Sequence, residues 1–157
     1  MSHARLFALA VAVLFTTSCS TPVDLKQSLQ VTDIATGYFD QGVTADGANK
    51  LVPSVTFRLR DSSGNLSRVS LNLMFRVIGG QDVDEIFKQR VDFASGQTEL
   101  LTVRSGAGFT GTPPQSRLDM LKNKDFQDME VVIMVRQVSA QWLELQRIPI
   151  ERRLLTQ

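Results

Sequence analysis

Apolar and polar residues alternate with a period of two along most of the chain after residue 28. The cleanest run places Val69, Leu71, Leu73, Phe75 and Val77 on one face, with mostly polar residues between them. This alternation is typical of a β-strand with one buried face. Further strands are predicted over 29–34, 55–60, 87–93, 100–103, 129–136 and 142–154.

Turn-forming residues separate these runs. The segment Asp61–Asn65 predicts a turn that joins the strands at 55–60 and 69–77 as a hairpin, and a long connection rich in Gly, Asp and Asn is expected from Asp40 to Asn49. The change of parity between Val31 and Ile34 indicates a β-bulge. Pro149 lacks a backbone N–H, so the last strand is expected to be an edge strand or to break there.

One segment has helical signals instead. Thr112 is a candidate N-cap, Pro113 stands at the first helical position, and Leu118 and Leu121 lie one turn apart, which predicts a short helix ending near Asn123. About seven strands and one short helix predict an all-β fold over residues 28–157. An antiparallel β-sandwich of immunoglobulin-like topology is the favoured form. A small β-barrel is the alternative, because the alternation pattern is the same in both.

The first eighteen residues follow a different pattern. Arg5 precedes an apolar run from Leu6 to Phe15, and the small residues Thr16–Ser18 lead to Cys19. This is the layout of a secretory signal peptide, and its apolar run is well short of the ~20 residues that a membrane-spanning helix needs. We therefore expect residues 1–18 to be cleaved and residues 19–27 to form a short tether.

The segment Leu14-Phe15-Thr16-Thr17-Ser18-Cys19-Ser20 resembles the lipobox of bacterial lipoproteins, with Thr16 where that family usually has leucine. The resemblance implies that Cys19 becomes the N-terminus and carries acyl chains such as palmitate. Because Ser20 is not aspartate, it also implies an outer-membrane protein facing the periplasm. Two or three acyl chains hold a protein firmly in a bilayer.

A second resemblance concerns the rest of the chain. The segments Asn49–Leu59, Leu71–Arg76 and Gly108–Thr112 resemble those of short bacterial envelope proteins. More loosely, the layout is similar to extracytoplasmic immunoglobulin-like domains of the FxLYD type. These resemblances imply a fold and a compartment, but no activity.

Composition removes most catalytic chemistry. Cys19 is the only cysteine, and His3, the only histidine, lies in the segment expected to be cleaved. The rest of the chain therefore has no Ser-His-Asp or Cys-His system, no zinc site of His/Cys type and no histidine for haem. The chain has 17 Lys and Arg against 16 Asp and Glu without a basic block, which argues against nucleic acid. We expect no enzymatic activity, catalytic residue, metal or cofactor.

Two segments resemble known ligand-binding motifs. Gly106–Gly111 matches the spacing GxGxxG of a dinucleotide site, but the predicted helix begins after the third glycine, so a loop is the favoured interpretation. Asp82, Asp84 and Glu85 could offer oxygen ligands to Ca²⁺, but they lack the EF-hand spacing. A solvated acidic loop is favoured there.

Aromatic residues near loops are the candidate contacts. Tyr38, Phe39, Phe109 and Trp142 border predicted loops, where binding residues often lie, although such residues also serve as core plugs. The pair Arg152–Arg153 could meet lipid headgroups or end the chain in solvent. The hypothesis is a non-enzymatic lipoprotein, anchored through Cys19, that binds another envelope component, an envelope protein in particular. The alternative is a glycan- or lipid-binding module that uses the loop aromatics.

Overall fold

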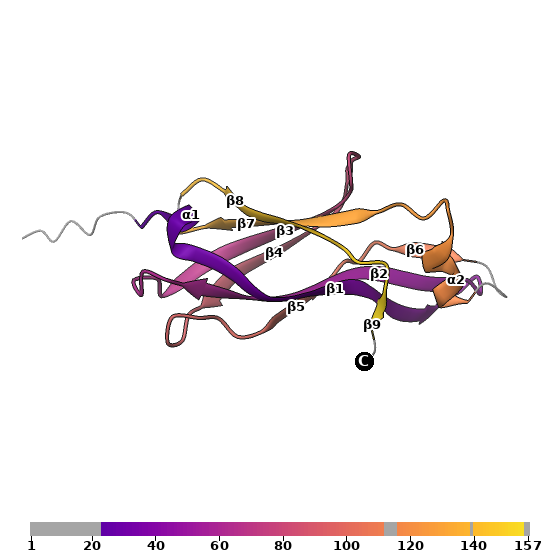
Figure 1. Ribbon diagram of the computed structural model, residues 1–157, viewed down its shortest axis with the longest axis horizontal. Coiled ribbons are helices and arrows are strands. Elements are labelled where there is room, and N and C mark those ends of the chain that lie inside the picture. The colour runs from indigo at the N-terminus through magenta and orange to yellow at the C-terminus, as the bar shows by residue number, and fades with distance from the viewer. Residues whose placement is uncertain (1–22, 112–115, 139, 156–157) are drawn as a thin grey trace, which may run out of the picture.

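The computed structural model describes residues 23–111, 116–138 and 140–155, which form two β-sheets packed face to face (Figure 1). The strands are β1 (Leu29–Val43), β2 (Asn49–Asp61), β3 (Arg68–Val77), β4 (Asp82–Asp92), β5 (Leu101–Arg104), β6 (Phe109–Gly111), β7 (Met129–Arg136), β8 (Leu143–Pro149) and β9 (Leu154–Leu155). The helices are α1 (Leu25–Ser28) and α2 (Arg117–Lys122).

The strand order is that of an immunoglobulin-like sandwich. One sheet runs β5-β2-β1-β9, with β6 also paired to β2, and the other runs β4-β3-β7-β8. Because β5 and β6 pair with different stretches of β2, they act as one interrupted edge strand, which gives seven strand positions. Short β9 adds a parallel pairing to β1. The predicted β-sandwich is confirmed, and the described strands do not close into a barrel.

The predicted hairpin between the second and third strands is wrong. Strand β2 lies in the first sheet and β3 in the second, so the turn after Asp61 carries the chain from one sheet to the other. The Asp61 carboxylate accepts hydrogen bonds from the backbone N–H groups of Ser63 and Leu66, which fixes this crossing. Alternation shows which face of a strand is buried, but it does not identify the neighbouring strand.

The true hairpin joins β1 and β2. Strand β1 continues to Val43, so the connection predicted from Asp40 to Asn49 is shortened to residues 44–48, a turn in which the Thr44 N–H donates to the Ala48 carbonyl. The predicted bulge is present, because the register shifts between Thr32 and Ala35. The consequence is that Tyr38 lies inside a strand rather than beside a loop.

Strand β4 changes face at a bulge that the sequence pattern does not reveal. Val91 opposes Val69 and is buried, whereas Lys88 opposes Leu71 and the register shifts between the two pairs. Phe87 therefore opposes Asn72 on the outer face and is 50% exposed. In the strand predicted over 87–93, the period of two places Phe87 and Val91 on the same face, and this expectation is wrong because one extra residue reverses the alternation.

Both helices are short. The predicted end of α2 is confirmed, with Asn123 as C-cap, but its N-cap is Ser116, whose side chain accepts from the Asp119 N–H, and not Thr112. Residues 112–115 lie outside the described residues. Helix α1 falls in the predicted tether, and its Leu25 is buried in the core, so the folded part of the chain begins before residue 28.

The core lies between the two sheets. Its largest members are fully buried, with Tyr38 and Phe57 from one sheet and Phe75, Leu73 and Ile133 from the other. They come from the inward positions of the strands. The sequence pattern predicts this for all of them except Tyr38, which it places beside a loop. Strand β8 is an edge strand that ends at Pro149, in agreement with the expectation for that proline.

Candidate functional site

Two of the four candidate contact residues meet inside the protein. The ring of Tyr38 packs edge-on against Phe109 at 6.0 Å and against Phe126 at 4.9 Å, and Phe109 lies 4.2 Å from Phe126. Tyr38 is fully buried, and Phe109 is partly buried. Phe126 is the member that sequence analysis missed. The cluster joins β1 and β6 to the segment after α2, so Tyr38 and Phe109 are packing residues here.

The glycine motif allows one strand to approach another closely. A Cβ atom on Gly108 would lie 2.3 Å from the Leu51 carbonyl oxygen, so only glycine fits there. Directly after it, Phe109 opposes Leu51 as β6 joins β2. Helix α2 begins at Arg117, beyond the motif, so no helix N-terminus lies where a pyrophosphate would bind. The predicted loop is present only over residues 106–108, because residues 109–111 form strand β6.

The acidic segment 82–85 is the start of strand β4 rather than the predicted loop, and its carboxylates have separate partners. Asp84 Oδ2 accepts from the Ser105 hydroxyl at 2.7 Å and from the Gly106 N–H at 2.6 Å, whereas Glu85 accepts from the Asn72 amide and Asp82 pairs with Arg76. Burial alone would raise the pKa of Asp84, but these donors and the Glu85 N–H lower it below its usual range. Among the described residues no group of three or more His, Cys, Asp or Glu could hold a metal.

Phe39 lies on the outer face of the first sheet. The Arg104 guanidinium carbon is 3.4 Å from its ring centroid, and Leu155 of β9 opposes it in the register. The ring is partly exposed. Arg104 and β9 thus cover Phe39 from two sides, so only part of its ring is accessible.

The two arginines near the C-terminus bind the protein itself. Arg152 Nε pairs with Asp128 at 2.7 Å, and another of its N–H groups donates to the Phe126 carbonyl. Arg153 Nε donates to the Thr36 carbonyl at 2.7 Å. These contacts hold the segment that crosses from β8 to β9, so the structure uses both guanidinium groups within the fold.

Trp142 lies on the outer face of the second sheet. Its ring meets Phe87 edge-on at 5.7 Å, and the Arg136 guanidinium carbon lies 4.4 Å from the Trp142 centroid and 5.9 Å from that of Phe87. We call Phe87, Arg136 and Trp142 the tryptophan patch. Sequence analysis missed Phe87 because the β4 bulge reverses its face. No described groove is lined by these three residues.

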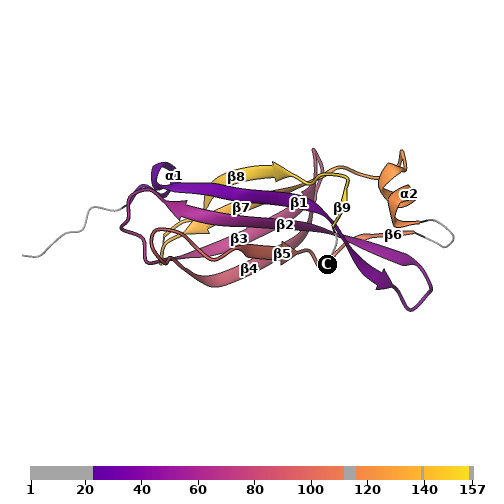
Figure 2. The ribbon, with the colours of Figure 1, turned by 60° about the horizontal axis from the view of Figure 1, so that its bottom comes forward.

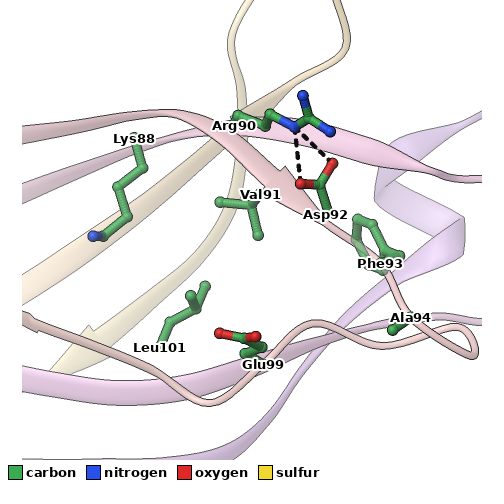
Figure 3. Close-up of a pocket in the computed structure, with 8 residues that line it drawn as sticks. All are labelled: Lys88, Arg90, Val91, Asp92, Phe93, Ala94, Glu99 and Leu101. Atoms are coloured by element: carbon green, nitrogen blue, oxygen red, sulfur yellow. Dashed lines mark hydrogen bonds and ion pairs between the residues drawn. The ribbon is translucent and has the colours of Figure 1, made fainter.

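A groove of about 510 Å³ opens along the opposite side of β4, between the two sheets (Figure 3). One wall is β4, the edge of its sheet, and the other is the edge formed by β5 and the residues before it. The apolar lining comes from Val91, Phe93 and Leu101. Because β4 pairs only with β3 among the described strands, its other edge has backbone groups that no described strand uses.

Charge is distributed unequally around the groove. Lys88 on β4 and Glu99 on the opposite side point into it, whereas Arg90 and Asp92 pair with each other at 2.8 Å on its outer rim (Figure 3). The strand register explains why the Lys88 side chain points inward, because the bulge places it opposite the buried Leu71. We call this site, lined by residues 88, 91, 93, 99 and 101, the edge groove.

Both ends of the edge groove are closed. The hydrogen bonds from Ser105 and Gly106 to Asp84 join its two walls at one end. At the other end the walls are joined by the chain itself, which passes from Phe93 to Glu99 through a turn in which Ala94 pairs with Gln97. The groove is therefore a short slot. Its polar residues are not recognisable from sequence, because no local motif brings Lys88 and Glu99 together.

Comparisons of the chain with protein-family models, with curated proteins and with solved structures give no match. Neither described helix is long and apolar enough to cross a bilayer. Cys19, the residue expected to carry the acyl chains, lies outside the described residues. The candidate functional features are therefore the edge groove and the tryptophan patch, on different sides of β4.

Proposed function

We propose that the protein is a non-enzymatic lipoprotein of the outer membrane, anchored through acylated Cys19, whose β-sandwich binds another envelope protein. The lipobox-like segment before Cys19 supports the anchor. The observation that carries the binding role is the edge groove, since an extended segment of a partner can add to a free strand edge and fill an adjacent apolar slot.

The groove also supports selectivity. An inward lysine on an edge strand discourages indiscriminate strand pairing, because burying its ammonium group without a partner is costly. A segment that brings a carboxylate to Lys88 and a cation to Glu99 satisfies both charges. We therefore favour an extended peptide segment with an apolar side chain between an acidic and a basic residue.

A glycan- or lipid-binding module is less well supported. That alternative needs a ligand pocket lined by Tyr38, Phe109 or Trp142, but Tyr38 is buried, Phe109 packs against Phe126, and Trp142 lines none of the described grooves. The hollow that Phe109 lines measures only about 120 Å³. A glycan site needs aromatic faces open to stacking; the Tyr38 ring is buried, and the partly buried Phe109 ring packs against Phe126.

The test uses site-specific photo-crosslinking in intact cells. A photoreactive residue at Leu101, whose side chain lines the groove, should capture one envelope protein, and Lys88→Glu should abolish the product. The matched control is Thr102, the next residue of β5, whose hydroxyl contacts Thr56 on the other face of the sheet. Equal capture at position 102, or a product indifferent to Lys88→Glu, would contradict the proposal.

The anchor is tested separately. A Cys19→Ala variant should lose palmitate labelling and leave the membrane fraction, because Cys19 is the only thiol in the chain. Labelling that persists in this variant would contradict anchoring at Cys19, while leaving the crosslinking result to decide the binding role.

A further inference from the structure

The tryptophan patch lies at the end of the sandwich from which the expected anchor emerges. Strand β7 ends and β8 begins beside α1, and both views of the ribbon show these elements at one end (Figures 1 and 2). Lys26 of α1 and Leu145 of β8 line the same hollow, and Lys26 attracts the Glu144 carboxylate. The N-terminal segment therefore joins the fold next to Trp142.

The chain between the anchor and this end is short. Four residue steps separate Cys19 from Val23, the first described residue. An extended chain of this length reaches at most about 14 Å. If Cys19 is acylated, the end of the sandwich that carries α1 and the start of β8 is held at the bilayer surface.

The chemistry of the patch fits that surface. Tryptophan is enriched at membrane interfaces, where its ring lies among the headgroups and its N–H remains hydrated. Arg136 stacks on the rings and can present its N–H groups to lipid phosphates, and Val138, two residues later, is 81% exposed. Trp142 and Phe87 supply the apolar area and Arg136 the positive charge.

We propose that the tryptophan patch docks on the anionic surface of the bilayer that holds the anchor, and that this contact orients the sandwich with the edge groove accessible. The proposal rests on the anchoring at Cys19 proposed above. The patch and the edge groove lie on different sides of β4, so bilayer contact at the patch leaves the groove open to an extended segment.

Trp142 is the only tryptophan in the chain, which makes it a direct reporter. The mature acylated protein is reconstituted into vesicles of phosphatidylethanolamine and phosphatidylglycerol whose acyl chains are brominated. Docking predicts loss of Trp142 emission relative to vesicles without bromine, and Arg136→Glu should restore emission. Arg104→Glu is the matched control, because it also removes an arginine stacked on a ring, Phe39, but on the other sheet.

Vesicle flotation separates the two proposals. Flotation with unquenched emission overturns the docking while the anchor stands, and it would indicate that the patch is free for a protein partner. Equal recovery of emission in Arg136→Glu and Arg104→Glu also overturns it, because the effect would then come from net charge. Loss of flotation contradicts the anchor and the docking together.

Discussion

Tyr38 carries a fully buried hydroxyl group that has no hydrogen-bond partner among the described residues. Burial raises the pKa of the phenol, and the nearby Asp128 carboxylate raises it further, so the group stays neutral at ordinary pH. A buried polar group without a partner is destabilising, whereas the ring around it packs against Phe109 and Phe126. The Tyr38 ring therefore stabilises the fold, whereas its unpaired hydroxyl group destabilises it.

We predict that Tyr38→Phe increases the free energy of unfolding by about 1 kcal/mol, because it removes the unpaired hydroxyl and keeps the ring. Tyr38→Ala should lower it by roughly 3 kcal/mol or more, because it leaves a cavity beside two aromatic rings. Urea unfolding followed by circular dichroism measures both. A destabilised Tyr38→Phe variant would show that the hydroxyl is satisfied in solution and that this account of the site is wrong.

Gly108 offers a second test at single-residue scale. We predict that Gly108→Ala lowers the free energy of unfolding by about 1–3 kcal/mol, since the new methyl group would overlap the Leu51 carbonyl. Gly106→Ala is the control within the same motif, because its Cβ would meet only Asp84 Oδ2 at 3.7 Å, an ordinary contact. Unfolding midpoints that fall equally in the two variants would contradict the close approach as the reason for glycine at 108.

At the scale of elements, one carboxylate joins the two sheets at the end of the edge groove. Asp84 on β4 accepts from Ser105 and Gly106, which follow β5. Because these donors hold its native pKa below the ordinary value of about 4, its contribution to stability is complete above that pH. The contribution is lost as the pH falls through the depressed native pKa, when the carboxylate becomes protonated.

We therefore predict that Asp84→Asn is less stable than the wild type near neutral pH and that the difference narrows below about pH 4. Urea midpoints measured from pH 7 down to pH 3 give the comparison. Ser105→Ala, which removes one donor and keeps the carboxylate, should lower stability at pH 7 while retaining part of the acid dependence. A wild type and an Asp84→Asn variant with parallel pH profiles would exclude this role for Asp84.

The sequence predicts most of the individual strands, but it does not predict how they pair. Alternation identifies the strands around 69–77 and 129–136, because a period of two reports burial of one face. It does not identify the partner, so β2 and β3 were expected to pair although they lie in different sheets. Nor does it reveal the β4 bulge, which exposes Phe87 and turns Lys88 inward. The edge groove and the tryptophan patch depend on the strand pairing and on the β4 bulge. Neither can be predicted from sequence, because no local pattern encodes contacts between distant strands.

At the scale of the whole molecule, the length of the tether between Cys19 and the sandwich sets the effective concentration of the tryptophan patch at the bilayer. If Cys19 is acylated as proposed, the four residue steps to Val23 would keep the tryptophan patch close to the bilayer, so even a weak surface contact would be favoured. A longer flexible tether lets the domain sample a larger volume, and the effective concentration falls roughly as the −3/2 power of tether length. On the docking proposal, tether length should therefore change the docked population without changing the patch.

We predict that a flexible Gly/Ser spacer inserted between Cys19 and Val23 leaves vesicle flotation unchanged but reduces the quenching of Trp142 by brominated lipids. The control carries the same spacer after Gln157, at the other end of the chain, and should be quenched like the wild type. Quenching that is indifferent to the N-terminal spacer would mean that the patch binds lipid strongly by itself. In that case Arg136, Phe87 and Trp142, rather than the short tether, would determine how the sandwich lies on the membrane.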